Sequence, residues 1–171
     1  MDNLKILYTQ DEIDARETEI AKMLDEEYKG KEIVAVCILN GAVFFAVDIM
    51  KKMETVLVFD TLQVSSYVGT ESTGNVILKK DIEADVKGKD VLILEDIIDT
   101  GKTLKYVKDH IMSKGPNSVK ICTLVDKKYR REENIESDYN CFTVDNKFVV
   151  GYGFDIDGVG RNIPYIGYIE Q

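Results

Sequence analysis

The residues most able to do chemistry lie in one short stretch, which reads VLILEDIIDTGKTL from Val91 to Leu104. Four aliphatic residues end in two adjacent carboxylates, Glu95 and Asp96, and a Gly-containing turn then leads into a helical pattern. This pattern is typical of a buried parallel strand, a loop and a helix start. Backbone N–H groups at such a turn, with threonine hydroxyls and the helix dipole, favour phosphate. The carboxylates can accept hydrogen bonds from sugar hydroxyls, so the stretch predicts a site for a phosphorylated ribose.

The same stretch admits two other interpretations. Gly101, Lys102 and Thr103 match the end of the G-x-x-x-x-G-K-[ST] phosphate loop, but that pattern requires a glycine where this chain has Asp96. A carboxylate there would repel the phosphates that such a loop must hold. The other alternative is an ordinary strand–loop–helix with solvated acids. Because the acid pair, an aspartate, Thr-Gly and a second threonine occur in one turn, we favour the ligand site.

The segment EDIIDTGKT closely resembles the phosphoribosyl pyrophosphate (PRPP) motif of type I phosphoribosyltransferases, above all that of the hypoxanthine-guanine branch. Further segments match this family in the same order from about Ile33 to Ile169. The resemblance implies purine salvage, with transfer of a 5-phosphoribosyl group from PRPP to hypoxanthine or guanine, giving IMP or GMP and pyrophosphate. It also implies Mg²⁺ as the cofactor and a homodimer or homotetramer as the assembly.

The chain has 171 residues, which is enough for one sizeable core and predicts a single domain over residues 1–171. Its net charge of −9 argues against general affinity for nucleic acid or for an anionic membrane. The first residues do not resemble a signal peptide, and no apolar run approaches the roughly 18 residues of a membrane span. The densest basic cluster is interpreted mainly as a solvated loop, and it consists of Lys127, Lys128, Arg130 and Arg131.

The few cysteines and the single histidine limit the kinds of catalytic and metal site that the chain can form. Cys37, Cys122 and Cys141 each lie in an apolar run without a CxxC pair, which predicts buried free thiols in a reducing cytoplasm. His110 is the only histidine, so a Ser-His-Asp or Cys-His device would have to use it, and a His/Cys zinc site is poorly supplied. Acid–base chemistry and metal ligation are therefore expected to rest mainly on carboxylates and lysines.

Apolar periodicity divides the chain into strands and helices. Helices are expected at 11–29, 42–52 and 100–114, and strands at 33–39, 55–64, 76–79, 91–94, 118–125, 140–144 and 147–152. Thr9 and Glu12 match a capping box for the first helix. Residues 65–75, rich in turn formers, are expected to form a mobile loop, and a turn at 145–146 should separate the last two strands.

Strands that alternate with helices predict an α/β fold with a parallel sheet and helices on both faces. In such sheets ligands bind beyond the carboxyl ends of the strands. The loops at Asn40, 96–103, 126–127 and 152–155 each follow an expected strand, so we expect them to meet at one crevice. The resemblance adds a type I phosphoribosyltransferase fold with a small hood built from the terminal segments.

The transfer reaction needs N–H donors for the 5′-phosphate, acceptors for the ribose hydroxyls and carboxylates near the positive charge that develops on the ribose. The candidates for phosphate and ribose binding are Glu95, Asp96, Asp99, Thr100, Gly101, Lys102 and Thr103. Asp99 is in addition the candidate general base that takes a proton from the purine nitrogen.

The resemblance assigns pyrophosphate binding to three separate segments. The residues concerned are Leu39, Asn40, Gly41, Ser66, Tyr67 and Arg161. The first three would form a strained turn, for which an ordinary strand-to-helix turn is the alternative. Relatives often carry a basic residue at position 40, so contacts by Asn40 would rest on backbone groups. Ser66 and Tyr67 match a lid that closes over pyrophosphate and excludes water, although a simple flexible loop has the same composition.

The purine pocket implied by the resemblance consists of Lys127, Phe148, Val149 and Asp155. Lys127 would contact the 6-oxo group, with a one-residue ambiguity that leaves Lys128 as the alternative. Phe148 would stack on the purine while the backbone of Val149 reads its edge, although an aromatic residue in a strand is more often core.

Metal binding would use Glu95, Asp96 and Asp155, of which Asp155 resembles the acid that holds a pyrophosphate-bound Mg²⁺. One departure from the family lies beside this residue. Residues 156–160 read IDGVG, where relatives usually carry an acidic residue and aromatics before the arginine. Two glycines are expected to loosen this loop.

Two rival functions follow from the same residues. The nearest is a phosphoribosyltransferase that uses xanthine or a pyrimidine. The other is a regulator that keeps the fold to sense PRPP without catalysis, which would need a nucleic-acid surface. The acidic balance and the presence of Asp99 with a complete base pocket favour an enzyme that acts on small molecules.

Overall fold

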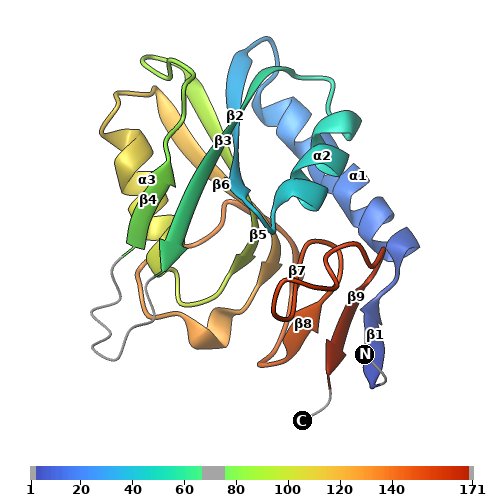
Figure 1. Ribbon diagram of the computed structural model, residues 1–171. Helices are drawn as coiled ribbons and strands as arrows, with labels where there is room; N and C mark the ends of the chain where they lie inside the picture. The colour runs from blue at the N-terminus through green and yellow to red at the C-terminus, as the bar shows by residue number, and fades with distance from the viewer. Residues whose placement is uncertain (1–2, 67–75, 170–171) are drawn as a thin grey trace.

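In the computed structural model, which describes residues 3–66 and 76–169, a six-stranded sheet lies beside a smaller three-stranded sheet (Figure 1). The strands of the larger sheet, in spatial order, are β4 (Val76–Lys80), β3 (Val56–Ser66), β2 (Glu32–Leu39), β5 (Asp90–Ile98), β6 (Ser118–Asp126) and β7 (Tyr139–Thr143). All neighbours in this sheet pair in parallel except β3 and β4. The predicted α/β fold with a largely parallel sheet is therefore confirmed.

Helices cover both faces of the sheet, as predicted, because its central strands are apolar on both sides (Figure 1). Along β2, residues 33, 35 and 37 join the core cluster under α1 (Gln10–Glu27) and α2 (Val43–Lys52). Residues 34, 36 and 38 join the cluster under α3 (Lys102–Met112) on the opposite face. Each fully buried Ile or Val side chain contributes about 1.5–3 kcal/mol to folding, and the strand's period of two divides that burial between the two faces.

The first helix begins where its capping residues predict. The N–H of Glu12 donates to Thr9 Oγ1 over 3.3 Å, and the N–H of Thr9 donates to Glu12 Oε2 over 2.8 Å. These reciprocal bonds form the predicted capping box and satisfy donors at the helix start. No helix in the described part of the chain is long and apolar enough to cross a membrane.

The three-stranded antiparallel sheet consists of β1 (Leu4–Tyr8), β9 (Ile166–Ile169) and β8 (Phe148–Val150), in that spatial order. We call this sheet, with the loop at 151–165 that connects β8 to β9, the hood. It combines an N-terminal with a C-terminal segment, as predicted, although β1 itself was not among the expected strands. The last two expected strands, β7 and β8, belong to different sheets, so the turn at 145–146 does not form a hairpin.

Two further boundaries differ from prediction. Strand β5 does not end at Leu94 but continues to Ile98, because its pairing with β6 runs on to Ile98 and Asp126. Glu95 and Asp96 are therefore strand residues and not loop residues. The expected loop at 65–75 begins later, because β3 extends to Ser66. The rest of that loop, including Tyr67, lies outside the described residues.

Candidate active site

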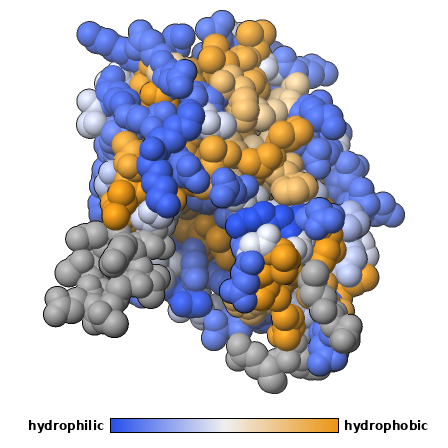
Figure 2. Space-filling view, in the orientation of Figure 1, coloured by the Kyte–Doolittle hydropathy of each residue, from blue (hydrophilic) through white to orange (hydrophobic). Residues whose placement is uncertain are grey.

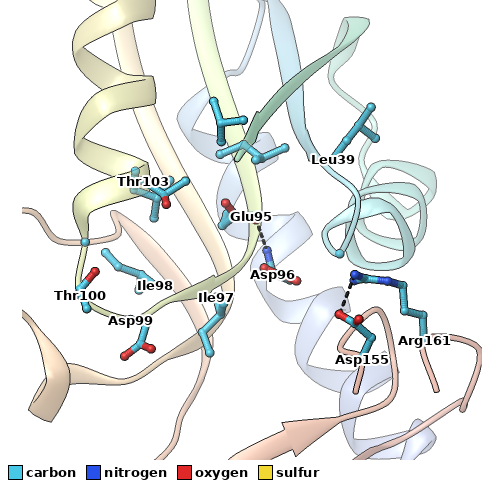
Figure 3. A pocket seen from close by; sticks show the side chains of 15 residues that line it. Leu39, Glu95, Asp96, Ile97, Ile98, Asp99, Thr100, Thr103, Asp155 and Arg161 are labelled. Carbon is cyan, nitrogen blue, oxygen red and sulfur yellow. Dashed lines mark hydrogen bonds and ion pairs between the residues drawn. The ribbon is translucent and has the colours of Figure 1, made fainter. Parts of the chain in front are cut away.

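A pocket of about 310 Å³ lies at the carboxyl ends of β2 and β5 (Figure 3). Its walls come from four places: the ends of the two strands, the turn after β2, the loop that enters α3, and the hood. The lining residues are Ile38, Leu39, Gly41, Val64, Glu95, Asp96, Ile97, Ile98, Asp99, Thr100, Gly101, Thr103, Leu104, Asp155 and Arg161. The pocket thus occupies the position where open parallel sheets bind ligands. Three of the four loops that were expected to meet there contribute lining residues, and the loop at 126–127 does not.

The loop that enters α3 has the conformation of an anion site. Gly101, at the helix N-terminus, has a left-handed φ of +89°, and a Cβ there would lie 2.7 Å from Ile135 Cγ2. Both facts require glycine at the start of this helix, which is the end of a helix that favours anions. Thr100 and Thr103 line the same wall (Figure 3). Lys102 does not, since its ammonium group pairs with Glu132 over 2.6 Å.

The two acids at the end of β5 form a compact pair. The N–H of Asp96 donates to Glu95 Oε1 over 3.0 Å, and Glu95 is buried (Figure 3). Burial, followed by the neighbouring Asp96 charge, raises the pKa of Glu95 well above its usual range. Burial also raises the pKa of Asp96, an effect opposed by the cationic Arg161. Both acids line the pocket, and Asp96 is the less buried of the two.

The turn after β2 packs directly against this acid pair. The peptide bond between Leu39 and Asn40 is cis. A Cβ on Gly41 would lie 1.8 Å from Asp96 Oδ2, so only glycine leaves room for the carboxylate. Leu39 and Gly41 line the pocket, whereas Asn40 is absent from its lining. The structure therefore brings two of the three predicted turn residues into the site.

The hood closes the pocket with an ion pair between Arg161 and Asp155, whose Nη2 and Oδ1 lie 2.6 Å apart (Figure 3). Arg161 Nη1 also donates to the carbonyl oxygen of Gly153. The expectation that glycines loosen residues 156–160 is not supported by the hydrogen bonds. Ile156 and Val159 exchange two backbone hydrogen bonds of 3.0 Å, so the segment folds into a tight turn between Asp155 and Arg161.

Of the predicted purine residues, only Asp155 is in the lining of the pocket. Lys127 is only 7% exposed, and burial lowers its pKa while the charge of Asp99 opposes that shift. Lys128, the alternative, is exposed. Phe148 is 48% exposed at the start of β8, so it is not a core residue, whereas Val149 is buried. The described structure thus brings Lys127 near Asp99 and leaves the face of an aromatic ring accessible on the hood.

A family model of the phosphoribosyl transferase domain matches residues 4–157 of this chain. The chain belongs to the phosphoribosyltransferase family. It is 43% identical over 168 residues to the hypoxanthine-guanine phosphoribosyltransferase of Streptococcus thermophilus (strain CNRZ 1066), covering 98% of this chain and 93% of the relative. It is 42% identical over 173 residues to the hypoxanthine-guanine-xanthine phosphoribosyltransferase of Tritrichomonas foetus, covering 100% and 94%.

Solved structures lead to the same family. A crystal structure of a hypoxanthine phosphoribosyltransferase from Staphylococcus aureus matches this fold with a TM-score of 0.94 and 42% identity, covering 99% of this chain and 93% of that one. The predicted type I phosphoribosyltransferase fold and the resemblance to the hypoxanthine-guanine branch are both confirmed.

Sequence reasoning missed how the basic segment after β6 holds the loop that enters α3 in this phosphoribosyltransferase. The N–H groups of Glu132 and Glu133 both donate to the carbonyl oxygen of Thr100, over 2.9 and 3.1 Å. Arg131 is 10% exposed on its side chain, pairs with Asp126 and donates to the carbonyl oxygen of Asp99. The prediction of a solvated loop is wrong for Arg131. In the sequence, the only sign of these contacts was the presence of neighbouring arginines shortly after the end of a strand.

Arg130 also has a partner that the sequence did not reveal. Its Nε lies 3.2 Å from Asp99 Oδ1, which forms no well-aligned hydrogen bond within the described residues.

Ser66 ends β3, and Tyr67 falls outside the described residues, so the predicted lid stays a prediction.

The phosphoribosyltransferase pocket can supply oxygen ligands for a hard divalent cation. Among residues 3–66 and 76–169, no group of three or more His, Cys, Asp or Glu side chains could hold a metal unaided. The carboxylates of Glu95, Asp96 and Asp155 belong to residues that line the pocket. One or two carboxylates, completed by substrate phosphates and water, are the usual Mg²⁺ environment, so the donor set fits such an ion.

Proposed function

We propose that this chain transfers the 5-phosphoribosyl group of PRPP to hypoxanthine or guanine and releases pyrophosphate. The observation that supports this most is the convergence, on one pocket, of an anion-binding helix N-terminus, an acid pair and a separate aspartate, all supplied by β5 and the loop after it. These three features match a phosphate, a ribose diol and a purine nitrogen that must lose a proton. The relatives' names point to the same substrates.

In the proposed arrangement each part of PRPP has its own wall of the pocket. The N–H groups and hydroxyls of residues 100–103 bind the 5′-phosphate, and Asp96 accepts hydrogen bonds from the ribose hydroxyls. Arg161 and the turn at Leu39–Gly41 face the pyrophosphate. Mg²⁺, held by the pocket carboxylates and the substrate's own oxygens, would neutralise charge on the leaving group.

The remaining steps belong to protein side chains at the purine end. As the bond between ribose and pyrophosphate breaks, the purine nitrogen attacks the ribose carbon, and Asp99 takes the proton that this nitrogen loses. The protonated Lys127 donates to the 6-oxo group, and Phe148 offers a face on which the ring stacks. Carboxylates near the ribose stabilise the positive charge that develops there.

A base panel tests the proposal. Purified protein with Mg²⁺ and PRPP is incubated with hypoxanthine, guanine, xanthine, adenine or uracil, and pyrophosphate release is followed. We expect turnover with the first two, and Asp99→Asn should lower it by about 10²–10⁴-fold by removing the base. The control Asp109→Asn removes a surface carboxylate of α3 that pairs with Lys105, and should leave turnover unchanged. Turnover with uracil alone, or none with any base, would refute the proposal.

We further propose that the chain forms a homo-oligomer. Hydrophobic side chains gather on the surface over α2 and β3 (Figure 2). The exposed residues concerned are Val43, Phe44, Val47 and Phe59. Contiguous apolar surface of this kind is typical of protein–protein contacts. Light scattering at micromolar concentration tests this, and a monomer would contradict it.

A further inference from the structure

A polar cluster around the buried Glu17 and Tyr152 lies outside the pocket and joins the hood to the two helices on one face of the sheet. The hydroxyl of Tyr152 donates to Glu17 Oε1 of α1 over 2.6 Å and lies 2.8 Å from Asp48 Oδ2 of α2. Lys52 Nζ donates to Glu17 Oε2 over 2.9 Å and pairs with Asp14 at the same distance. We call these five side chains the hood anchor. Its members come from three separate segments of the chain and hold them together.

The Tyr152 hydroxyl is shared between its two acceptors. It has a single hydrogen, whereas carboxylate oxygens of both Glu17 and Asp48 lie within hydrogen-bond distance of it. Glu17 is 1% exposed, whereas the Asp48 side chain is 38% exposed, so the contact with Glu17 is the one shielded from water.

Charged side chains and two thiols surround Glu17. The cations and acids that face it from α1 and α2 are Asp14, Asp48, Lys51 and Lys52. The thiols of Cys122 on β6 and Cys141 on β7 lie behind it. Burial raises the pKa of Glu17, against the opposing hydrogen bonds from Tyr152 and Lys52.

The hood anchor is connected to the pocket through the residue that follows Tyr152. Tyr152 has a left-handed φ of +50°, unusual for a residue with a side chain, so the loop here needs a tether. A Cβ on Gly153 would lie 2.1 Å from the carbonyl oxygen of Gly41, and the Gly153 carbonyl accepts a hydrogen bond from Arg161. The N–H of Gly153 in turn donates to the carbonyl oxygen of Arg161 over 3.0 Å. A shift of Tyr152 therefore moves Arg161 as well.

We propose that Tyr152 is a positioning residue for the pyrophosphate end of the pocket. Its hydroxyl, shared between Glu17 and Asp48, holds Gly153 against the turn at Gly41 and thereby fixes the direction of the Arg161 guanidinium. Lys127 and Asp99 of the purine end follow β6 and β5 of the large sheet and make none of these contacts, whereas Phe148 lies on the hood strand that precedes Tyr152. This inference rests on the proposed function, in which Arg161 contacts pyrophosphate.

The first test removes only the hydroxyl, with Tyr152→Phe. We expect kcat/KM for PRPP to fall about tenfold and the affinity for inorganic pyrophosphate, measured by calorimetry with Mg²⁺, to fall by a similar factor. The KM for hypoxanthine should stay within about twofold. The matched control is Thr55→Val, which removes a hydroxyl-to-carboxylate hydrogen bond of 2.6 Å to Asp25 near the start of β3. It should lower Tm comparably and leave both substrates unaffected.

A double-mutant comparison separates positioning from simple destabilisation. If Tyr152 acts through Arg161, adding Tyr152→Phe to Arg161→Lys should change kcat/KM for PRPP by less than about twofold, since coupled residues are not additive. Additive losses, equal losses for both substrates, or no loss would overturn the inference. If Tyr152→Phe does not fold, Asp48→Ala is used instead, because it removes the more exposed acceptor of the Tyr152 hydroxyl. An affinity for pyrophosphate equal to that of the parent protein in this variant would overturn the inference. An inactive parent protein that still binds pyrophosphate would refute the proposed function alone.

Discussion

Adding one methyl group to Gly41 should disable the site while leaving the fold in place. The Cβ of Gly41→Ala would lie 1.8 Å from Asp96 Oδ2 and 2.9 Å from Asp96 Cγ. Ordinary contact begins at 3.4 Å, so the carboxylate oxygen would have to retreat by about 1.6 Å. The turn cannot move away instead, because the Gly41 carbonyl is already packed against Gly153 on its other side.

The size of the effect follows from this displacement. A misplacement of 1 Å at a reacting centre can cost about 10²-fold in rate, so we expect kcat/KM for PRPP to fall by about 10²-fold or more in Gly41→Ala. The stability cost should be the ordinary one for overpacking, about 1–3 kcal/mol. The KM for hypoxanthine should change little, because Asp96 lies at the ribose side of the pocket and not beside Lys127.

The assay is pyrophosphate release at varied PRPP with saturating hypoxanthine, and thermal unfolding is measured in parallel. Gly88→Ala is the control, because Gly88 has φ +70° and no atom within 4 Å of the added Cβ. It should lose about 1–2 kcal/mol through backbone strain and keep full activity. A folded Gly41→Ala variant with kcat/KM within about threefold of the parent would show that the position of the Asp96 carboxylate is not needed.

Two further predictions concern charge. Lys127→Ala should lower kcat/KM for hypoxanthine and guanine by about 10–100-fold, since a buried charged donor is lost. It should not create adenine activity. The 6-amino group of adenine and the lysine ammonium are both donors, so efficient adenine use by the parent would contradict the role of Lys127. Because burial lowers the pKa of Lys127, hypoxanthine use in the parent should decline with rising pH before an ordinary lysine, near 10.4, would titrate. Glu17→Gln should flatten the pH dependence of stability. The pKa of Glu17 is raised in the folded protein, so its contribution to the free energy of unfolding is complete below about pH 4.5 and is lost as pH rises through the pKa of the folded state. Urea unfolding at a series of pH values checks this. Parallel pH profiles of stability for parent and variant would refute it.

The parts of the fold that the sequence predicts are those decided by local patterns. The apolar run of β2 predicts a strand buried on both faces, and the capping pair of Thr9 and Glu12 marks a helix start. The extension of β5 through Glu95 could not be seen in this way. Two acids look like the end of a buried strand, but the backbone of β6 continues to pair alongside them. Burying this pair raises the pKa of Glu95, which a sequence pattern does not express.

In the candidate site, too, features formed by consecutive residues were predictable, and features that depend on distant partners were not. The place of the loop that enters α3 in the pocket was predictable because its polar residues are consecutive in the chain. The environments of Arg131 and Tyr152 were not, because their partners lie on other elements: Asp126 at the end of β6 for the arginine, and Glu17 on α1 for the tyrosine. The turn at 156–160 shows a further limit. Glycine content suggested looseness, whereas left-handed conformations at Gly158 and Gly160 allow a compact turn that brings Asp155 and Arg161 together.

The order of strands in the hood determines when the pocket can be completed during synthesis. Strand β9, near the end of the chain, is the middle strand, and β1 pairs with it from Leu4 opposite Ile169 onward. Among the described strands β1 is synthesised before the others, and it has no sheet partner until β9 has emerged. The loop that enters α3 can form earlier, from neighbouring segments, but the wall that carries Arg161 has to wait for the hood. A nascent chain arrested before Ile166 should thus lack the hood side of the pocket.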